Sequence, residues 1–426
     1  MRSAKMLTVA GLLASTSLVL AGCSAETPEA APKNVDLRMT VWTANEDQLA
    51  LFDAIADEYI AEHPEVASIT FDPLPFEDYT TTLTTQIAGG KAPDLAWILE
   101  NSAPDFVSSG ALASIEDTLK DTKGYEFDDL NDAATSLWRD DGELIAYPFS
   151  TSPFVVFAND DLLAAAGQPS SAELQASGWD WEAVSAAGEA VQASTGKAGF
   201  VIRDFDYTTW DNLASVWMGW GAKPWSDDGA TCEFDSDEMV GAFEFLHKAA
   251  FEQKSMPGPG TTADFFAGEA AFTVTQISRA SLLAEGGYNW NLLPIPEGPE
   301  GEYSMVGQAG IGVLKQGEAP QVAADFLAFF SSPENSERLA QWFPPARDSQ
   351  LNAETLAAAN PVLSAEQIED VVVPGIATGV TRPSHTDSAQ IGQTVRAALD
   401  AVWTADADIP AVLANVCSEI NPLLEK

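Results

Sequence analysis

Twelve tryptophans stand out in this chain, because several of them fall at predicted strand ends or in loops rather than inside apolar periods. Trp42 precedes the polar run TANED, Trp97 lies beside ILEN, and Trp210 stands within YTTWDN. An indole can stack on the C–H face of a sugar ring, while Asp, Asn, Gln or Arg side chains pair with the ring hydroxyls. Core packing is the commoner role of any single tryptophan. As a group, however, these residues favour carbohydrate binding.

Residues suited to other chemistries are sparse or badly spaced. The three histidines, His63, His247 and His385, lie far apart and not at metal-ligand spacing, and His247 fits an ordinary helix position. The sequence contains no His-Glu-x-x-His, no Cys-x-x-Cys and no Gly-x-Ser-x-Gly motif. The run STGKAGF approaches a phosphate-binding loop, but Val191 replaces the required glycine and Ala198 the required Ser or Thr. We therefore predict no catalysis, no cofactor and no metal site.

The chain is strongly acidic, with 64 Asp and Glu against 20 Lys and Arg and a formal charge of −44 at pH 7. Such a charge repels the phosphates of nucleic acids and anionic lipid headgroups, so no nucleic-acid partner is expected. Because close carboxylate pairs arise by chance in so acidic a chain, acidity is no evidence for catalysis. A hydrophobic fraction of 46% in 426 residues predicts a folded protein with room for two lobes.

The N-terminal residues predict export and membrane anchoring. Arg2 and Lys5 precede an uncharged, leucine-rich run, which is the layout of a secretory signal. The run is shorter than the roughly 20 apolar residues of a spanning helix. It ends in LAGC, which resembles a lipobox, in which Cys23 is lipidated after removal of residues 1–22; a secreted protein with a stray thiol is the alternative. Residues 23–34 would then form a lipid anchor and flexible tether at the extracytoplasmic face of the cell membrane.

Lipidation of Cys23 would leave Cys232 and Cys417 as an even pair in an oxidising compartment. A disulfide needs their Cα atoms within bridging distance, and the sequence does not give that distance. A Cys232–Cys417 disulfide and two buried free thiols therefore both stay open.

Strands and helices alternate along the first part of the chain. Apolar runs at 37–42, 67–72 and 94–99 indicate strands, and helical periodicity connects them at 48–62 and 76–90. This order predicts a parallel sheet covered by helices on both faces. Sheets of this kind bind ligands at the carboxyl ends of their strands.

The pattern restarts after Tyr147 and predicts a second α/β lobe, with chain crossings near residues 147 and 275. The expected strands are 154–160, 270–275, 291–296 and 309–315, and the expected helices begin at Trp181 and span 208–218 and 237–252. The predicted fold class is α/β with two discontinuous lobes, lobe 1 formed by 35–147 plus 277–331 and lobe 2 by 148–276 plus 332–426.

Four segments stand in the order and at the intervals of a known family. They are residues 88–98 (AGGKAPDLAWI), 144–167, 265–276 (FFAGEAAFTVTQ) and 307–339, which ends in SSPENSERL. With them the chain resembles the extracellular solute-binding proteins of ABC importers, in the maltose-binding-protein-like branch, along nearly all of its mature length. The resemblance implies the two-lobed type II periplasmic-binding-protein fold and a monomer without catalysis. It also implies a cleft that closes around a carbohydrate, which is delivered to the transmembrane subunits of an ABC permease.

The resemblance further implies a set of ligand contacts, to which the tryptophan pattern adds Trp42. The maltose binder carries a stacking aromatic in its last helical region, but the matching position here is Gly392, so the exact sugar stays open. The arginines of the set suit bidentate contacts to ring hydroxyls or to the carboxylate of an acidic sugar; surface ion pairs are the alternative. The candidate ligand-binding residues are Trp42, Asn45, Glu46, Asn101, Ser152, Trp210, Asp211, Gln276, Arg279, Gln308 and Arg347.

Two other functions fit the sequence less well. The same fold could bind a non-sugar solute such as a glycerol phosphodiester, and the candidate arginines leave that open. A surface glycosidase or lyase would need a catalytic pair of carboxylates about 5–10 Å apart, and no motif supports one.

Overall fold

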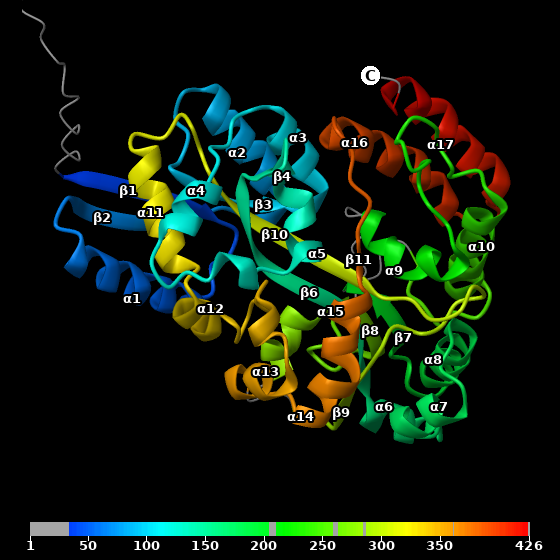
Figure 1. Cartoon of the computed structure of the whole chain (residues 1–426). Coiled ribbons are helices and arrows are strands. Elements are labelled where there is room, and N and C mark those ends of the chain that lie inside the picture. The colour runs from blue at the N-terminus through cyan, green and yellow to red at the C-terminus, as the bar shows by residue number, and fades with distance from the viewer. Residues whose placement is uncertain (1–33, 204–209, 259–262, 284–286, 361, 425–426) are drawn as a thin grey trace, which may run out of the picture.

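The computed structural model describes residues 34–203, 210–258, 263–283, 287–360 and 362–424. Two α/β lobes lie side by side, and long strands pass from one into the other (Figure 1). Cys23, the predicted signal and the predicted tether up to residue 33 lie outside the described residues. Within the described part of the chain, no helix is long and apolar enough to cross a membrane.

The main sheet mixes parallel and antiparallel strands. In spatial order these are β2 (Val66–Pro73), β1 (Val35–Val41), β3 (Leu95–Leu99), β10 (Met305–Val313), β6 (Ala146–Asn159), β8 (Ala270–Gln276) and β7 (Ala198–Ile202), with β9 (Trp290–Leu293) on β6 and β11 (Val380–Thr381) on β10. β1 pairs in parallel with β2 and β3, and β7 pairs in parallel with β8. β10 is antiparallel to β3 and β6, and β6 is antiparallel to β8. A separate small hairpin consists of β4 (Arg139–Asp140) and β5 (Glu143–Leu144).

The strand β6 belongs to both lobes and is buried along its whole length. Residues 146–153 of β6 pair with β10, whereas residues 154–158 pair with β8. One continuous strand therefore enters lobe 1 with its first half and lobe 2 with its second half. A small change of backbone angles near Pro153 would rotate the lobes relative to each other, as hinge motion requires.

Each lobe has its own hydrophobic core, covered by helices. The helices of lobe 1 are α1 (Glu46–Glu62), α2 (Tyr79–Ala88), α3 (Ala103–Ser108), α4 (Glu116–Asp121), α5 (Asp132–Thr135), α11 (Pro320–Phe330) and α12 (Pro333–Leu339). The helices of lobe 2 are α6 (Asp160–Ala165), α7 (Ser171–Ser177), α8 (Trp181–Thr195), α9 (Ala214–Trp217), α10 (Asp237–Phe251), α13 (Ala353–Ala359), α14 (Ala365–Gln367), α15 (Val373–Thr378), α16 (Ser388–Leu399) and α17 (Ile409–Leu424).

The helix α8 shows how local sequence sets these elements. Asp180 caps its start, with the carboxylate accepting from the Ala183 amide, and Gly196 ends it in the left-handed conformation at φ 74°. The predicted apolar positions, among them Trp181 and Val191, are buried against β7 and β8. The predicted helix is thus confirmed, with its packing face.

The two cores divide the chain differently from the predicted lobes. The segment 277–305, expected in lobe 1, packs in lobe 2 through residues such as Leu293. The segment 332–343, expected in lobe 2, packs in lobe 1 through residues such as Phe343. The physical reason is that β10, not the residues after β8, returns the chain to lobe 1, and α12 then stays there.

Most predicted elements are present, with three differences. β7 is absent from the predicted strands, since its five residues AGFVI follow a polar run and are short. β6 begins at Ala146 rather than at residue 154. The predicted helix 208–218 is a series of short turns, a 3₁₀ turn at Trp210–Leu213 followed by α9, and its first two residues lie outside the described chain.

A disulfide joins Cys232 to Cys417, so the alternative of two free thiols does not hold. Both cysteines are buried, and Cys417 lies in α17. The bond ties the last helix to the loop before α10 across a sequence separation of 185 residues.

Replacing both cysteines of the disulfide with serine is expected to lower the free energy of unfolding by about 2–5 kcal/mol, because the unfolded chain regains the entropy of a long loop. Urea unfolding followed by circular dichroism measures the change. Dithiothreitol should lower the midpoint of the natural protein and leave that of the double variant unchanged. Equal midpoints for the oxidised natural protein and the variant would contradict the prediction.

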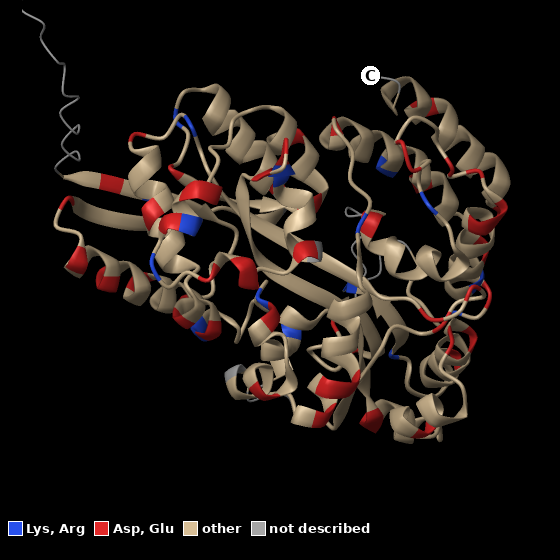
Figure 2. Cartoon of the chain, viewed as in Figure 1, with Lys and Arg blue, Asp and Glu red and all other residues tan. Residues whose placement is uncertain are grey.

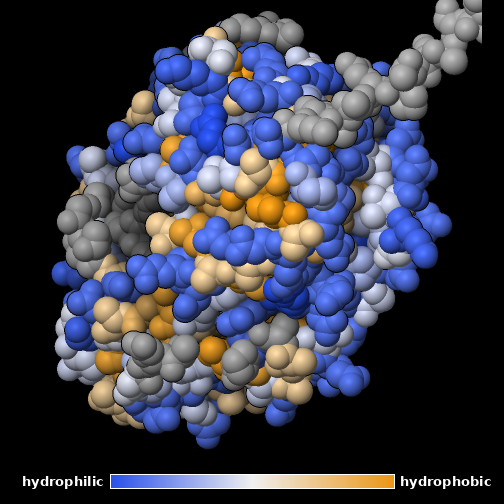
Figure 3. Space-filling view, turned by 90° about the vertical axis from the view of Figure 1, so that its left-hand side faces the viewer, coloured by the Kyte–Doolittle hydropathy of each residue, from blue (hydrophilic) through white to orange (hydrophobic). Residues whose placement is uncertain are grey.

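The surface carries the acidity that the composition predicts. Asp and Glu are distributed over the outer elements of both lobes, with few Lys and Arg between them (Figure 2). The face seen in Figure 3 is mainly hydrophilic, with hydrophobic residues gathered in small areas. Among the described residues, Leu282 and Val380 are the large hydrophobic side chains that are most exposed.

Candidate functional site

A cavity of about 120 Å³ lies between the lobes, at the carboxyl ends of strands that approach it from both sides. Trp42 directly follows β1, Glu100 follows β3, Arg203 follows β7, and Gln276 is the last residue of β8. This is the edge at which α/β sheets bind ligands. The described residues that line it are Trp42, Phe76, Leu99, Glu100, Phe149, Ser150, Ser152, Arg203, Gln276, Ser278, Arg279, Gly307, Gln308, Ala309, Phe343 and Arg382.

Aromatic side chains of lobe 1 form one wall of this cavity. The half-buried Trp42 ring lies 4.7 Å from Trp97 and 6.1 Å from Phe149, measured between ring centroids. Trp97 is 1% exposed and stacks on Phe149 at 4.6 Å, so it supports the wall without lining the cavity. Trp42 is therefore held by edge contacts that leave part of its ring at the cavity.

Arg382 forms a buried polar network that joins the two lobes. Its Nε donates to Oε1 of Glu100 at 2.6 Å, and its Nη1 donates to Oδ1 of Asn212 at 2.8 Å. The same Nη1 lies 3.4 Å from Oδ2 of Asp211. The side chains of Arg382 and Glu100 are 2% and 1% exposed. Burial raises the pKa of Glu100, and the guanidinium beside it opposes that shift.

Arg203 is a second cavity arginine with a different environment. Its Nη1 donates to Oε1 of Gln276 at 3.1 Å, and its guanidinium carbon lies 5.0 Å from the ring centroid of Phe76. Burial, with repulsion from Arg382 and Arg279, lowers the pKa of Arg203 to about 10. The residue stays charged at neutral pH.

The lobes are in contact around the cavity. Besides the Arg382–Glu100 pair, Asn101 of lobe 1 donates to Asp211 of lobe 2 at 3.4 Å. Asp105 in α3 accepts from the backbone amides of Asp387 and Ser388 at the start of α16. These contacts connect the two lobes beside the cavity.

Five of the residues predicted from sequence line the cavity: Trp42, Ser152, Gln276, Arg279 and Gln308. Gln308 in β10 is 4% exposed, and its Oε1 has no hydrogen-bond partner among the described residues. Ser152 in β6 accepts from the amide of Ser278 at 3.2 Å. The guanidinium of Arg279 lies 4.8 Å from the ring centroid of Phe266. A buried polar atom such as Gln308 Oε1 calls for a partner, which a bound solute would supply.

Two further predicted residues, Asn101 and Asp211, lie in the contact between the lobes rather than on the cavity wall. Three others lie elsewhere. Asn45 is exposed and caps α1, with its side chain accepting from the Gln48 amide at 3.0 Å, and Glu46 is exposed in the first turn of that helix. Trp210 is 8% exposed and stacks on Trp217 in the core of lobe 2. None of the three is among the described lining residues, so the expectation that they contact the ligand is not met in this cavity.

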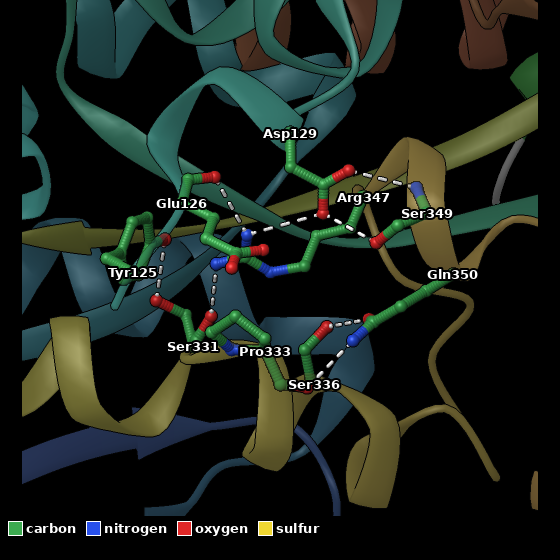
Figure 4. Close-up of polar contacts among 9 residues, drawn as sticks. All are labelled: Tyr125, Glu126, Asp129, Ser331, Pro333, Ser336, Arg347, Ser349 and Gln350. Carbon is green, nitrogen blue, oxygen red and sulfur yellow. Dashed lines mark hydrogen bonds and ion pairs between the residues drawn. The ribbon is translucent and has the colours of Figure 1, made fainter. Parts of the chain in front are cut away.

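Arg347 is also away from the cavity and is fully buried in lobe 1. Its Nη1 donates to the Glu126 carbonyl at 3.2 Å and its Nη2 to the Ser331 carbonyl at 3.0 Å (Figure 4). Its Nη1 lies 3.7 Å from Oδ2 of Asp129, and its guanidinium carbon lies 4.6 Å from the centroid of the Tyr125 ring. Arg347 therefore organises the loops of lobe 1, neither binding in the cavity nor forming a surface ion pair.

The lining residues missed by the sequence reasoning include three charged ones, Glu100, Arg203 and Arg382. Glu100 directly follows a predicted strand, so position alone could have found it. Arg203 directly follows β7 and Arg382 directly follows β11, and neither strand is among the predicted ones. Glu100 is the only carboxylate among the described lining residues, and Arg382 binds it. The described lining therefore offers no pair of free carboxylates for glycosidase chemistry.

A family profile matches residues 54–363, and its description is bacterial extracellular solute-binding protein. The chain belongs to this family. Members of the family are binding proteins, and a cavity between two lobes is the feature that such a solute-binding protein requires.

Proteins similar in sequence to this solute-binding protein include a Streptomyces lipoprotein and a periplasmic binding protein of Escherichia coli. One is a lipoprotein in the oleD 5′ region of Streptomyces antibioticus, 24% identical over 381 residues, with coverage of 82% of this chain and 78% of the relative. The other is the sn-glycerol-3-phosphate-binding periplasmic protein UgpB of Escherichia coli (strain K12), 25% identical over 332 residues, with coverage of 71% of each chain.

The fold of this solute-binding protein also matches a solved structure. The ABC substrate-binding protein Lmo0181 from Listeria monocytogenes, in complex with cycloalternan, superposes with a TM-score of 0.79 at 22% identity, covering 92% of this chain and 99% of the other. The predicted two-lobed α/β fold is thereby confirmed.

Proposed function

We propose that this protein is the substrate-binding lipoprotein of an ABC-type carbohydrate importer. It captures a sugar or oligosaccharide between its lobes and delivers it to the transmembrane permease subunits. The observation that carries the proposal is that one interlobe cavity is lined by the Trp42 ring and by Gln308, whose buried Oε1 has no hydrogen-bond partner among the described residues. An indole suits the C–H face of a sugar ring, and an amide oxygen suits a hydroxyl.

Closure of the lobes is the step by which binding is signalled. A solute that touches Trp42 in lobe 1 and Gln276 in lobe 2 makes its full set of contacts only when the lobes are closed. A ligand shifts a conformational equilibrium by the difference in its affinity for the two states. The permease can then distinguish the loaded protein from the empty one by shape.

Anchoring at the membrane is part of the same proposal. The LAGC run ending at Cys23 and the relationship to a Streptomyces lipoprotein support lipidation of Cys23. A lipid anchor with a tether up to residue 34 would keep the lobes beside the permease on the extracytoplasmic face. The expected working form is a monomer.

Replacing Trp42 with alanine is expected to weaken sugar binding by about tenfold or more, because stacking of this kind contributes about 0.5–1.5 kcal/mol beyond the area buried. The test starts from a thermal-shift panel of mono- and oligosaccharides. A ligand at about 100 times its Kd should add roughly 2.7 kcal/mol of stability and raise the midpoint. Calorimetry then measures the affinity of the natural protein and of Trp42→Ala for a sugar that raises the midpoint.

The matched control for Trp42 is Trp290→Ala, a half-buried tryptophan in β9 that does not line the cavity. Its affinity for the sugar should equal that of the natural protein. A panel in which no sugar raises the midpoint, or a Trp42→Ala variant with unchanged affinity, would remove the basis of the proposal.

A further inference from the structure

The helix α16 of lobe 2 begins against lobe 1 (Figure 1). Its buried residues, Ile391 and Val395 among them, belong to the core of lobe 2. The helix α3 carries Asp105, and the next residue, Phe106, packs in the core of lobe 1. The first turn of a helix of one lobe therefore meets a side chain of the other lobe.

The Asp105 carboxylate accepts three hydrogen bonds from the start of α16. Its Oδ1 accepts from the Asp387 amide at 2.6 Å, and its Oδ2 accepts from the Ser388 amide at 3.2 Å and from the Ser388 hydroxyl at 2.9 Å. The first amides of a helix have no partner within the helix, and the helix dipole favours a negative charge beside them. Asp105 thus caps α16 from the opposite lobe.

The backbone at the start of α16 is shaped to hold an anion. Asp387 is the N-cap residue, and its own side chain makes no capping hydrogen bond. Its φ of 61° lies in the left-handed region, which Asp tolerates better than most other non-glycine residues. A left-handed residue next to a helical one turns successive N–H groups toward one concave site that suits an anion. Lobe 1 supplies that anion through Asp105.

The cap depends on how closely the lobes approach each other beside the cavity. Asp105 lies in the helix that follows the lining residue Glu100, and Asp387 lies in the same segment between β11 and α16 as the lining residue Arg382. A hydrogen bond weakens steeply once its atoms move about 1 Å beyond the normal distance. Separation of the lobes around the cavity would therefore release the amides of α16 to water, and their approach would restore the cap.

We infer that Asp105 is a latch for lobe closure, which raises the affinity for the bound solute without touching the solute. Asp105 is not among the described lining residues. A residue that acts only on the population of the closed form changes the apparent affinity for every ligand by the same factor. The inference rests on the proposed function and adds to it a positioning residue outside the cavity.

The variant Asp105→Ala tests the latch, first without any sugar. Small-angle scattering of the ligand-free variant should give a larger radius of gyration than that of the natural protein, because the closed form loses its interlobe cap. Calorimetry then measures the affinity for each mono- or oligosaccharide that binds the natural protein in the thermal-shift panel. All of these affinities should fall by one common factor of about twofold to thirtyfold, the usual effect of losing an N-cap side chain.

The matched control is Asp180→Ala, because Asp180 caps α8 by the same chemistry within lobe 2, with its carboxylate accepting from the Ala183 amide at 2.7 Å. This variant should lower the urea midpoint and leave the radius of gyration and the sugar affinities unchanged. Asp387→Gly is a second control, since glycine adopts the left-handed conformation freely and keeps the amide that binds Asp105. Its radius of gyration should stay at the natural value.

Two results would overturn the inference. One is an Asp105→Ala variant whose ligand-free scattering and sugar affinities both equal those of the natural protein. The other is a variant that loses affinity for some sugars and not for others, which would point to a lost ligand contact rather than a latch. If no sugar of the panel binds the natural protein, the proposed function fails, and the ligand-free scattering alone decides whether Asp105 is a latch.

Discussion

Replacing Arg382 with methionine is expected to weaken ligand binding by about a hundredfold or more and to open the lobes of the ligand-free protein. Arg382 donates to Glu100 of lobe 1 and to Asn212 of lobe 2. Without it, closure would bury the Glu100 carboxylate unpaired, at a cost of about 3–5 kcal/mol. Because each 1.4 kcal/mol is a factor of ten in an equilibrium constant, a hundredfold loss follows. Opening returns Glu100 to water, so the closed form is lost rather than the fold.

The same variant should show a stronger pH dependence than the natural protein. Burial raises the pKa of Glu100, and the positive charge of Arg382 opposes this shift. Removal of Arg382 should therefore raise the pKa of Glu100 further in the closed form. A carboxyl group whose pKa is raised in the closed form favours that form below the raised pKa, where it is protonated, and disfavours it above. Affinity of Arg382→Met for the ligand should therefore increase as the pH is lowered through the raised pKa of Glu100.

Small-angle scattering of the ligand-free protein and calorimetry with the ligand measure these effects. The double variant Arg382→Met/Glu100→Gln is the matched control, because a neutral amide replaces the stranded carboxylate. It should recover much of the closed form and lose the pH dependence. An Arg382→Met variant with the natural radius of gyration and affinity would show that the network does not hold the lobes together.

The strands of the fold could be predicted where apolar runs are long or bounded by clear turns. β3 is a continuous apolar run, β1 and β2 carry apolar residues between polar ones, and the capped helix α1 separates β1 from β2. β7 could not be predicted in this way, because five residues after a polar run give no period. The lobe boundaries depend on which strand returns the chain to lobe 1. That strand is β10, and its pairing with β3 is a long-range contact that local sequence does not reveal.

The site was predictable where a residue follows or ends a strand, as Trp42 and Gln276 do. Arg382 could not be found, because its role comes from a contact with Glu100 at a separation of 282 residues. Trp210 looks like a cleft tryptophan in sequence, yet it packs on Trp217 in the core of lobe 2. An indole can stack on a sugar ring or pack in a hydrophobic core. Only the burial of the side chain in the structure distinguishes these two roles.

Replacing Arg347 with methionine is expected to lower the free energy of unfolding by about 3–5 kcal/mol and to leave ligand affinity unchanged. The change strands the carbonyls of Glu126 and Ser331, to which Arg347 donates, and leaves Asp129 without its nearby cation. Loss of one partner in a buried polar cluster has a cost of this size. Urea unfolding measures the stability, and calorimetry with the ligand measures the affinity.

A neighbouring arginine provides the matched control for Arg347. Arg338 pairs with Glu58, and the two side chains are 30% and 52% exposed, so Arg338→Met should change the stability by less than about 1 kcal/mol. Arg347→Lys keeps the charge but not the planar fork that reaches two carbonyls, and it should restore only part of the loss. If Arg347→Met instead lost affinity at unchanged stability, the residue would have to reach the ligand. The conclusion that it serves the fold of lobe 1 would then be wrong.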